Sequence, residues 1–185
     1  SVVSTANQQI ANDDNAWWSK IIHNRRLAYG VSYINHYFDN LSPDFLFIKG
    51  DGNPKFSIQS MGQMYLWELP FLLIGLLFLF KKRDGFWWII PIWLVLAIIP
   101  AATARETPHA LRIETTLPTF QILVAYGIVQ MFNLISNVKY QISNIKLKYI
   151  YIMAFAFVVL GSFIYFWEDY MVHYPKMFAH EWQYG

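Results

Sequence analysis

Four long apolar runs occupy most of the chain beyond residue 63 and predict its architecture. They cover residues 64–80, 86–104, 117–136 and 149–167, each about 17–20 residues long. At a rise of about 1.5 Å per residue, helices of this length cross a hydrocarbon core of about 30 Å, the shortest with help from flanking residues. Glu68 is the only formally charged side chain within the runs. We therefore expect an all-α membrane protein with four transmembrane helices.

Aromatic residues gather at the ends of these runs, as is typical of helices anchored at both membrane surfaces. They are Tyr65, Trp67, Trp87, Trp88, Tyr149, Tyr151, Tyr165 and Trp167. Prolines also lie inside or at the ends of the first two runs, at positions 70, 91 and 100. Membrane helices tolerate the kinks that such prolines cause.

The first 30 residues combine polar and apolar positions. From Ala16 to Tyr29 the apolar residues recur with roughly the 3.6-residue period of an amphipathic helix. Arg25 and Arg26 interrupt this pattern. The segment is too short and too charged to cross a bilayer, so we expect it to lie in the membrane interface.

Residues 31–63 are aromatic but broken by turn-forming stretches at 42–44 and 50–54. We expect an ordered aromatic loop outside the membrane, containing short helical or strand-like pieces. The chain thus divides into an extracytoplasmic or interfacial loop region (1–63), a transmembrane domain (64–167) and a tail (168–185).

The connecting loops predict an orientation. Residues 81–85 carry three basic side chains and one acidic one, and residues 137–148 carry three lysines and no acid. By the positive-inside rule, both loops are cytoplasmic in a multi-pass protein of the plasma (inner) membrane. Residues 1–63, the connection around 105–116 and the tail then share the outer side.

Composition agrees with a membrane protein and excludes other classes. Charged residues make up 14% of the chain, against about 25% in soluble domains. The net charge of +2 gives no basic footprint for nucleic acid, and the absence of cysteine excludes disulfides and thiol chemistry. The chain begins with Ser1 and shows no signal-peptide pattern, so we expect a piece of a longer membrane protein.

A polar island runs from Arg105 to Pro118 between two apolar runs. Ionisable groups at a membrane boundary are costly unless they are paired, hydrated or used. An arginine fork suits bidentate phosphate recognition, and a helical turn opened by Pro108 would place His109 and Arg112 on one face. The alternative is structural, with Arg105 and Arg112 anchoring helix ends by pairing with the acids at 68, 106 or 114.

Two further features are candidates for a cavity or loop site. Glu68 lies one turn into the first run, where it either serves a site or forms a salt bridge or reaches the interface. The stretch around Asp51, Asn53 and Lys55 has the composition of a turn, and it lacks the pattern of a calcium loop or a P-loop. The carboxylates at 39, 44 and 51 are potential bases, but their spacing pairs none of them.

Several motifs together resemble one enzyme family. They are SPDFLFIKGDGNPK (42–55), MGQMYLWELP (61–70), ETPHALR (106–112) and Leu117-Pro118. In combination they are similar to bacterial polytopic glycosyltransferases of the GT-C superfamily, related to the dolichyl-phosphate-mannose protein mannosyltransferases and the aminoarabinose transferases. The resemblance covers about residues 25–130, and each motif is weak alone.

The resemblance implies a transferase that moves a sugar from a polyprenyl-phosphate donor to an acceptor glycan, lipid or protein on the outer side. It implies that Arg112 holds the donor phosphate, with His109 and Arg105 as neighbours, and that the loop at 44–55 covers the cavity. Lys55 is followed by Phe56 where the family has a basic pair. The family's catalytic acid belongs to an earlier loop that we do not find in this chain. The resemblance leaves a divalent metal possible, but no metal-ligand set accompanies His109, so we expect no cofactor.

Two other functions remain open. In a transporter or channel, Glu68 and the arginines would line a pathway, for which the prolines at 91 and 100 are a faint indication without an inverted repeat. A non-catalytic polytopic membrane subunit is the third hypothesis. An acidic pair in a loop just after the first span of the longer protein would favour the enzyme.

Overall fold

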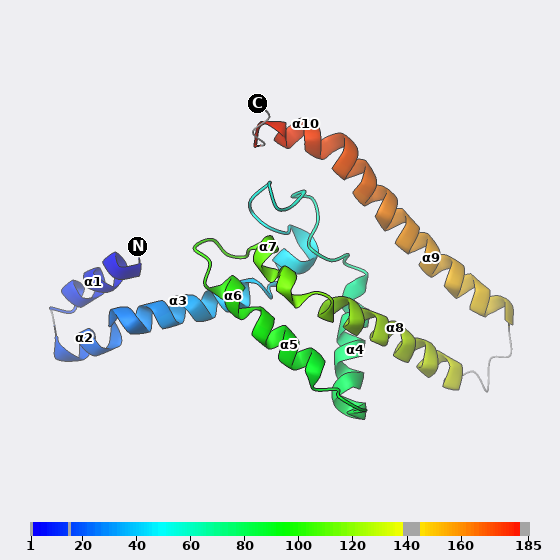
Figure 1. Ribbon diagram of the computed structural model, residues 1–185, viewed down its shortest axis with the longest axis horizontal. Coiled ribbons are helices and arrows are strands. Elements are labelled where there is room, and N and C mark those ends of the chain that lie inside the picture. The colour runs from blue at the N-terminus through cyan, green and yellow to red at the C-terminus, as the bar shows by residue number, and fades with distance from the viewer. Residues whose placement is uncertain (1, 15, 139–144, 182–185) are drawn as a thin grey trace.

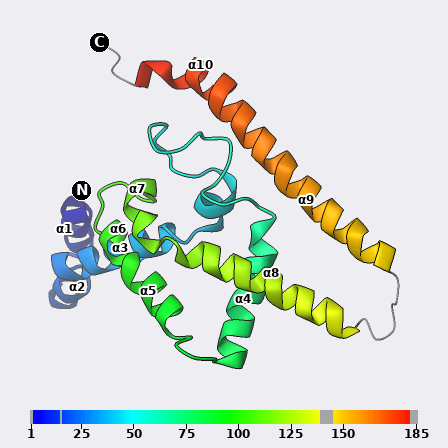
Figure 2. The same cartoon turned by 45° about the vertical axis from the view of Figure 1, so that its right-hand side comes forward.

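The computed structural model describes residues 2–14, 16–138 and 145–181, and every regular element within these ranges is a helix (Figure 1). The prediction of an all-α protein is confirmed for this part of the chain. Helices α1 to α3 extend to one side, helices α4, α5 and α8 lie in the middle, and α9 runs along the other side (Figures 1 and 2). The irregular chain between η1 and α4 and that between α6 and α7 lie near α7, between these groups (Figure 1).

The N-terminal region is more helical than its sequence pattern predicts. It contains α1 (Val2–Asn12), α2 (Trp17–Ile22) and α3 (Arg25–Asp39). The amphipathic segment is divided where the Asn24 side chain accepts a hydrogen bond from the Arg26 N–H at 2.9 Å and caps α3. Residues 31–39, expected in a loop, instead continue α3, because they contain no glycine or proline that would break the helix.

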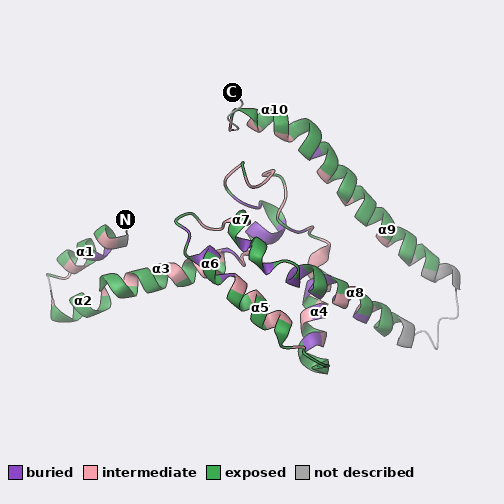
Figure 3. Cartoon of the chain, in the orientation of Figure 1, coloured by how far each residue is buried: buried purple, intermediate pink, exposed green. Residues whose placement is uncertain are grey.

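The expected aromatic loop therefore begins only after Asp39. It holds one π-helical turn, η1 (Asp44–Ile48), followed by irregular chain up to the start of α4. Phe45, Leu46 and Phe47 of this turn are buried in one apolar cluster with Ala110 and Ile113. In Figure 3 the buried positions accordingly concentrate around this turn, α7 and the start of α8.

Helices α4, α5 and α6 are shorter than their apolar runs, whereas α8 is as long as its run. The central helices are α4 (Glu68–Lys82), α5 (Ile89–Ala97), α6 (Ile99–Ala102), α7 (Ala110–Ile113), η2 (Glu114–Thr116) and α8 (Thr119–Val138). Helix α4 begins at residue 68 because the preceding residues form turns, and the second run is interrupted at Ile98.

Helices α4 and α8 form the main tertiary contact, and two glycines allow their backbones to approach closely. A Cβ atom on Gly75 would collide with the Leu123 carbonyl oxygen, and one on Gly127 with the Phe71 carbonyl oxygen. Small residues at a crossing are typical of helix pairs in membranes, where close van der Waals contact drives association. Leu72, Leu79, Leu123 and Val124 fill the surrounding core.

The last helical stretch is the most membrane-like. Helix α9 (Ile145–Glu168) continues through η3 (Asp169–His173), α10 (Tyr174–Phe178) and η4 (Ala179–Glu181). Among the described residues, only Ile152–Glu181 is by itself long and apolar enough to cross a membrane, and little of it is buried. A second crossing exists if Ala110–Thr116 and Thr119–Ile135, which are bent by 56°, form one broken span. Ile89–Ala102 is apolar but shorter.

The described helices thus provide one candidate span, or two with the bent pair, rather than the four expected. Half of the lysine-rich stretch expected at 137–148, residues 139–144, lies outside the described part, as do residues 182–185 of the tail.

Candidate functional site

Hydrogen bonds join the two polar segments of the sequence into one unit, which we call the polar platform (residues 39–63 and 105–118). Thr107 Oγ1 donates to Asp39 Oδ2 at 2.9 Å, and the His109 N–H donates to Asn40 Oδ1 at 3.0 Å. The Ala110 N–H donates to Asp51 Oδ2 at 2.7 Å. Hydrogen bonds to side-chain oxygens therefore join three segments: the end of α3, the loop after η1 and the start of α7.

Asp51 is the central brace of this platform. Only 5% of the residue is exposed, and its Oδ1 accepts the Asn53 N–H at 2.8 Å while Oδ2 accepts from Ala110. Its carbonyl oxygen also accepts from the Gln59 side chain at 2.6 Å. Since both carboxylate oxygens are occupied by main-chain donors, Asp51 is suited to holding two segments together rather than to removing a proton from a substrate.

The remaining loop residues form turns, as the composition of this stretch predicts. Gly50 adopts φ +74°, and a Cβ there would collide with the Ser57 side chain. Asn53 Oδ1 accepts the Lys55 N–H at 3.0 Å, which is a second Asx turn directly after that of Asp51. Lys55 itself is exposed.

The three residues assigned to phosphate binding have different environments. Arg105 and Arg112 are exposed, and no ion pair joins either to a carboxylate in the described part of the chain. The described residues thus show none of the ion pairs with the acids at 68, 106 or 114 that the structural alternative predicts. Two free guanidinium groups on a braced segment remain available to an external anion.

His109 does not lie in the helix that its spacing to Arg112 predicts. It is the N-cap of α7, with extended backbone at φ −135° and ψ 108°, so α7 starts one residue later and the shared helical face is not formed. Its ring stacks on Phe56 with centroids 5.1 Å apart, and its buried Nδ1 has no hydrogen-bond partner. Phe56 thus positions the histidine ring.

Glu68 lies at the edge of a cavity of about 260 Å³. The cavity is lined by Met61, Gly62, Gln63, Met64, Tyr65, Glu68, Gln121 and Phe166. Glu68 Oε2 accepts the Tyr65 N–H at 2.8 Å, so one oxygen of this carboxylate fixes the start of α4. The sequence pattern does not predict the contribution of Gln121 and Phe166, because these residues belong to α8 and α9 and only the fold brings them to Glu68.

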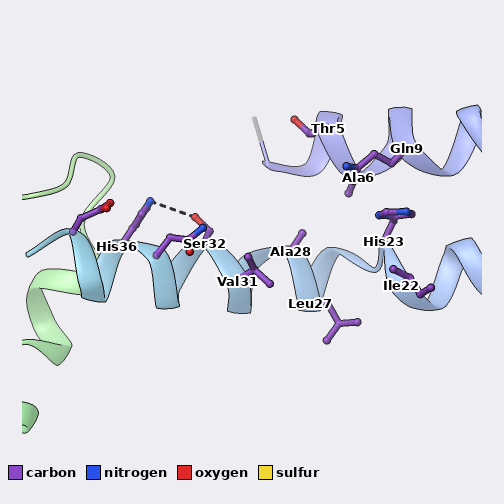
Figure 4. Close-up of a pocket in the computed structure, with 12 residues that line it drawn as sticks. Thr5, Ala6, Gln9, Ile22, His23, Leu27, Ala28, Val31, Ser32 and His36 are labelled. Atoms are coloured by element: carbon purple, nitrogen blue, oxygen red, sulfur yellow. Dashed lines mark hydrogen bonds between the residues drawn. The ribbon is translucent and has the colours of Figure 1, made fainter. Parts of the chain in front are cut away.

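A larger cavity of about 570 Å³ lies between α1 and the α2–α3 pair (Figure 4). Ile22, Leu27 and Val31 supply apolar surface, and His23 and His36 supply polar groups. His23 Nε2 is 3.4 Å from Asp13 Oδ2, and the Ser32 hydroxyl is 3.3 Å from His36 Nε2. None of the residues predicted to bind the donor lines this cavity.

The comparisons with known proteins add no relative. No protein-family model, no curated protein and no solved structure matches the chain. The resemblance to the GT-C superfamily therefore rests on the sequence motifs alone. Among the described residues, no group of three or more histidine, cysteine or acidic side chains is placed to hold a metal ion.

Proposed function

We propose that this chain is part of a polytopic membrane glycosyltransferase and that its polar platform holds the phosphate of a polyprenyl-phosphate-linked sugar. One observation carries the proposal. Arg105 and Arg112 are exposed and have no carboxylate partner among the described residues, although the segment that bears them is fixed by the bonds to Asp39, Asn40 and Asp51. A cation held in place next to apolar helices suits the charged head of a lipid-linked substrate.

In the proposed topology α4, the α5–α6 pair, α8 and α9 each cross the bilayer. Helix α4 and Ile89–Ala102 are shorter than a full span, so they require flanking residues or local thinning of the bilayer. Residues 81–85 and 137–148 are then cytoplasmic, and the platform faces the outer side together with the tail. The hydrogen bonds from Ser60 to Asp169 and from Tyr174 to Pro54 support a common side for the platform and the end of α9.

The proposed reaction is inversion at the anomeric carbon. A deprotonated acceptor attacks this carbon, and the lipid phosphate leaves with the electrons of the glycosidic bond. The guanidinium of Arg112 stabilises the negative charge that develops on the phosphate, an electrostatic contribution that is commonly worth a factor of about 10² to 10³ in rate. We assign no catalytic base within this chain, and Asp51 is unsuited to that role because its oxygens are occupied.

The test is replacement of Arg112 in the full protein, measured as sugar transfer from the lipid donor. Arg112→Ala should lower kcat/KM for the donor by about a hundredfold. Arg112→Lys should recover only part of the activity, because an ammonium group lacks the guanidinium fork. Arg83→Ala is the matched control, since Arg83 is exposed on the opposite, lysine-rich loop. Unchanged transfer and donor affinity in Arg112→Ala would refute the assignment.

A transporter is the second candidate, and the bent pair favours it. Ala110–Thr116 and Thr119–Ile135 meet at 56°, and discontinuous helices of this kind form substrate sites near the middle of many transporters. Flux of a phosphate-bearing solute through proteoliposomes, lost in Arg112→Ala while no sugar transfer is detected, would support this function instead. A non-catalytic subunit would show neither activity.

A further inference from the structure

We propose that the cavity at the start of α4 binds a primary ammonium group. This site is separate from the arginines of the platform and does not depend on the glycosyltransferase assignment. Its central feature is the Glu68 carboxylate, of which Oε2 is occupied by the Tyr65 N–H at 2.8 Å. The carboxylate has no basic partner among the described residues, and no basic side chain lines the cavity.

An uncompensated carboxylate in a partly buried cavity favours a cationic ligand. Glu68 is half-buried, so its charge is stabilised less by water than that of a surface acid. An ammonium group brings both the opposite charge and hydrogen-bond donors, and charge-assisted bonds of this type are stronger than neutral ones. A phosphate would meet only negative charge here, so the lipid donor proposed for the platform does not fit this cavity.

The other lining residues also suit a cation. Tyr65 and Phe166 present aromatic rings, whose faces attract ammonium groups. Both rings are held in place by neighbours, Tyr65 by stacking on Trp67 at 6.1 Å and Phe166 by stacking on Tyr170 at 5.7 Å between centroids. Gln121 contributes an amide whose oxygen accepts a further N–H.

The position of the cavity indicates where such a group comes from. Phe166 belongs to the membrane-span candidate Ile152–Glu181, and Glu68 begins the apolar helix α4. The cavity therefore lies where apolar helices meet polar chain, which in the topology proposed above is the level of the lipid headgroups. An aminolipid headgroup reaches it from the bilayer, and a free amine reaches it from water; the recognised chemistry is the same for both.

The experiment uses the full chain in lipid nanodiscs and follows tryptophan fluorescence and the melting temperature. Ethanolamine is titrated in phosphatidylglycerol nanodiscs, with ethylene glycol as a neutral probe of similar size. In a second arm, phosphatidylethanolamine replaces part of the phosphatidylglycerol, which keeps the phosphodiester and adds the ammonium group. Glu68→Gln should weaken the response to the amine about tenfold, while retaining an amide oxygen for the Tyr65 N–H. The exposed Glu106→Gln is the matched control.

Saturable binding of ethanolamine but not of ethylene glycol, weakened in Glu68→Gln alone, supports the site with a free amine as ligand. A response only to phosphatidylethanolamine, again lost in Glu68→Gln, supports a lipid headgroup. Equal responses to both soluble probes, or equal responses of the wild type and Glu68→Gln in both arms, overturn the proposal. Phe166→Leu keeps the carboxylate and removes a ring, so it should weaken binding about threefold; it decides the question if Glu68→Gln does not fold.

Discussion

The α4–α8 pair and the polar platform are held together in opposite ways. In the helix pair, two glycines bring main chains into direct contact and apolar side chains fill the rest. In the platform, buried carboxylate and amide oxygens accept main-chain N–H groups from distant segments. The stability of the helix pair therefore depends on how closely its surfaces fit, and that of the platform depends on every buried oxygen keeping its donor. Added side-chain volume should therefore destabilise the helix pair, and the loss of a hydrogen-bond acceptor should destabilise the platform.

The largest effect is expected from a single methyl group at the helix crossing. In Gly127→Ala the new Cβ would collide with the Phe71 carbonyl oxygen, and a backbone atom cannot rotate away as a side chain would. We expect a loss of about 3 kcal/mol in unfolding free energy, measured by thermal or denaturant unfolding in detergent. Gly161→Ala in α9 is the control, because nothing lies within 4 Å of a Cβ at that position. Equal behaviour of the two variants would mean that the close approach is not required.

A smaller loss is expected when the platform loses one acceptor. Asp51→Asn keeps the shape of the side chain but replaces one oxygen by an NH₂ group, so either the Asn53 or the Ala110 N–H loses its bond. We expect a cost of about 2 kcal/mol, seen as a lower melting temperature. Asp44→Asn serves as the matched control, since the Asp44 carboxylate forms an exposed ion pair with Lys49 at 3.1 Å and such pairs contribute little. If Asp44→Asn lowers the melting temperature as much as Asp51→Asn does, the hydrogen bonds of Asp51 do not stabilise the platform more than an exposed acid does.

The smallest effect is expected for a polar contact inside the apolar pair. Lys82 Nζ donates to Gln130 Oε1 at 2.9 Å across α4 and α8. Lys82→Met should cost about 1 kcal/mol, because Gln130 is only 5% exposed and its amide oxygen loses the bond from the lysine, whose own end is exposed. Lys81→Met gives the baseline for the same change on the neighbouring, exposed residue. A loss as large as that of Gly127→Ala would show that the helix pair also depends on polar bonds.

The sequence predicted helical class well because long apolar runs leave the chain few other choices. It predicted less well where each element ends. Helix α3 continues to Asp39, beyond the predicted end at Tyr29, because residues 31–39 contain no glycine or proline that would break it. Likewise, apolar character at 64–67 and around residue 98 does not reveal that the chain turns or breaks there.

The candidate sites, too, could be predicted from the sequence only in part. The polar island and Glu68 were visible as charges among apolar residues, and Asp51 was visible as part of a turn. The hydrogen bond from the Ala110 N–H to Asp51 could not be predicted from the sequence, because a bond between segments far apart in the chain leaves no local pattern. The contributions of Gln121 and Phe166 to the Glu68 cavity depend on how α8 and α9 approach α4, which residue types alone do not specify.

The stretch from Asp51 to Ser60 has no regular secondary structure, yet hydrogen bonds hold both of its ends to other segments. Asp51 is bonded to the start of α7, and Ser60 donates to Asp169 at the end of α9. Pro54, between them, accepts from Tyr174. A surface loop usually accepts extra residues and changes length freely between related proteins. Here an inserted residue would shift one anchor relative to the other, so this irregular segment is as constrained in length as a helix, and it is a poor place for a tag or a permuted terminus.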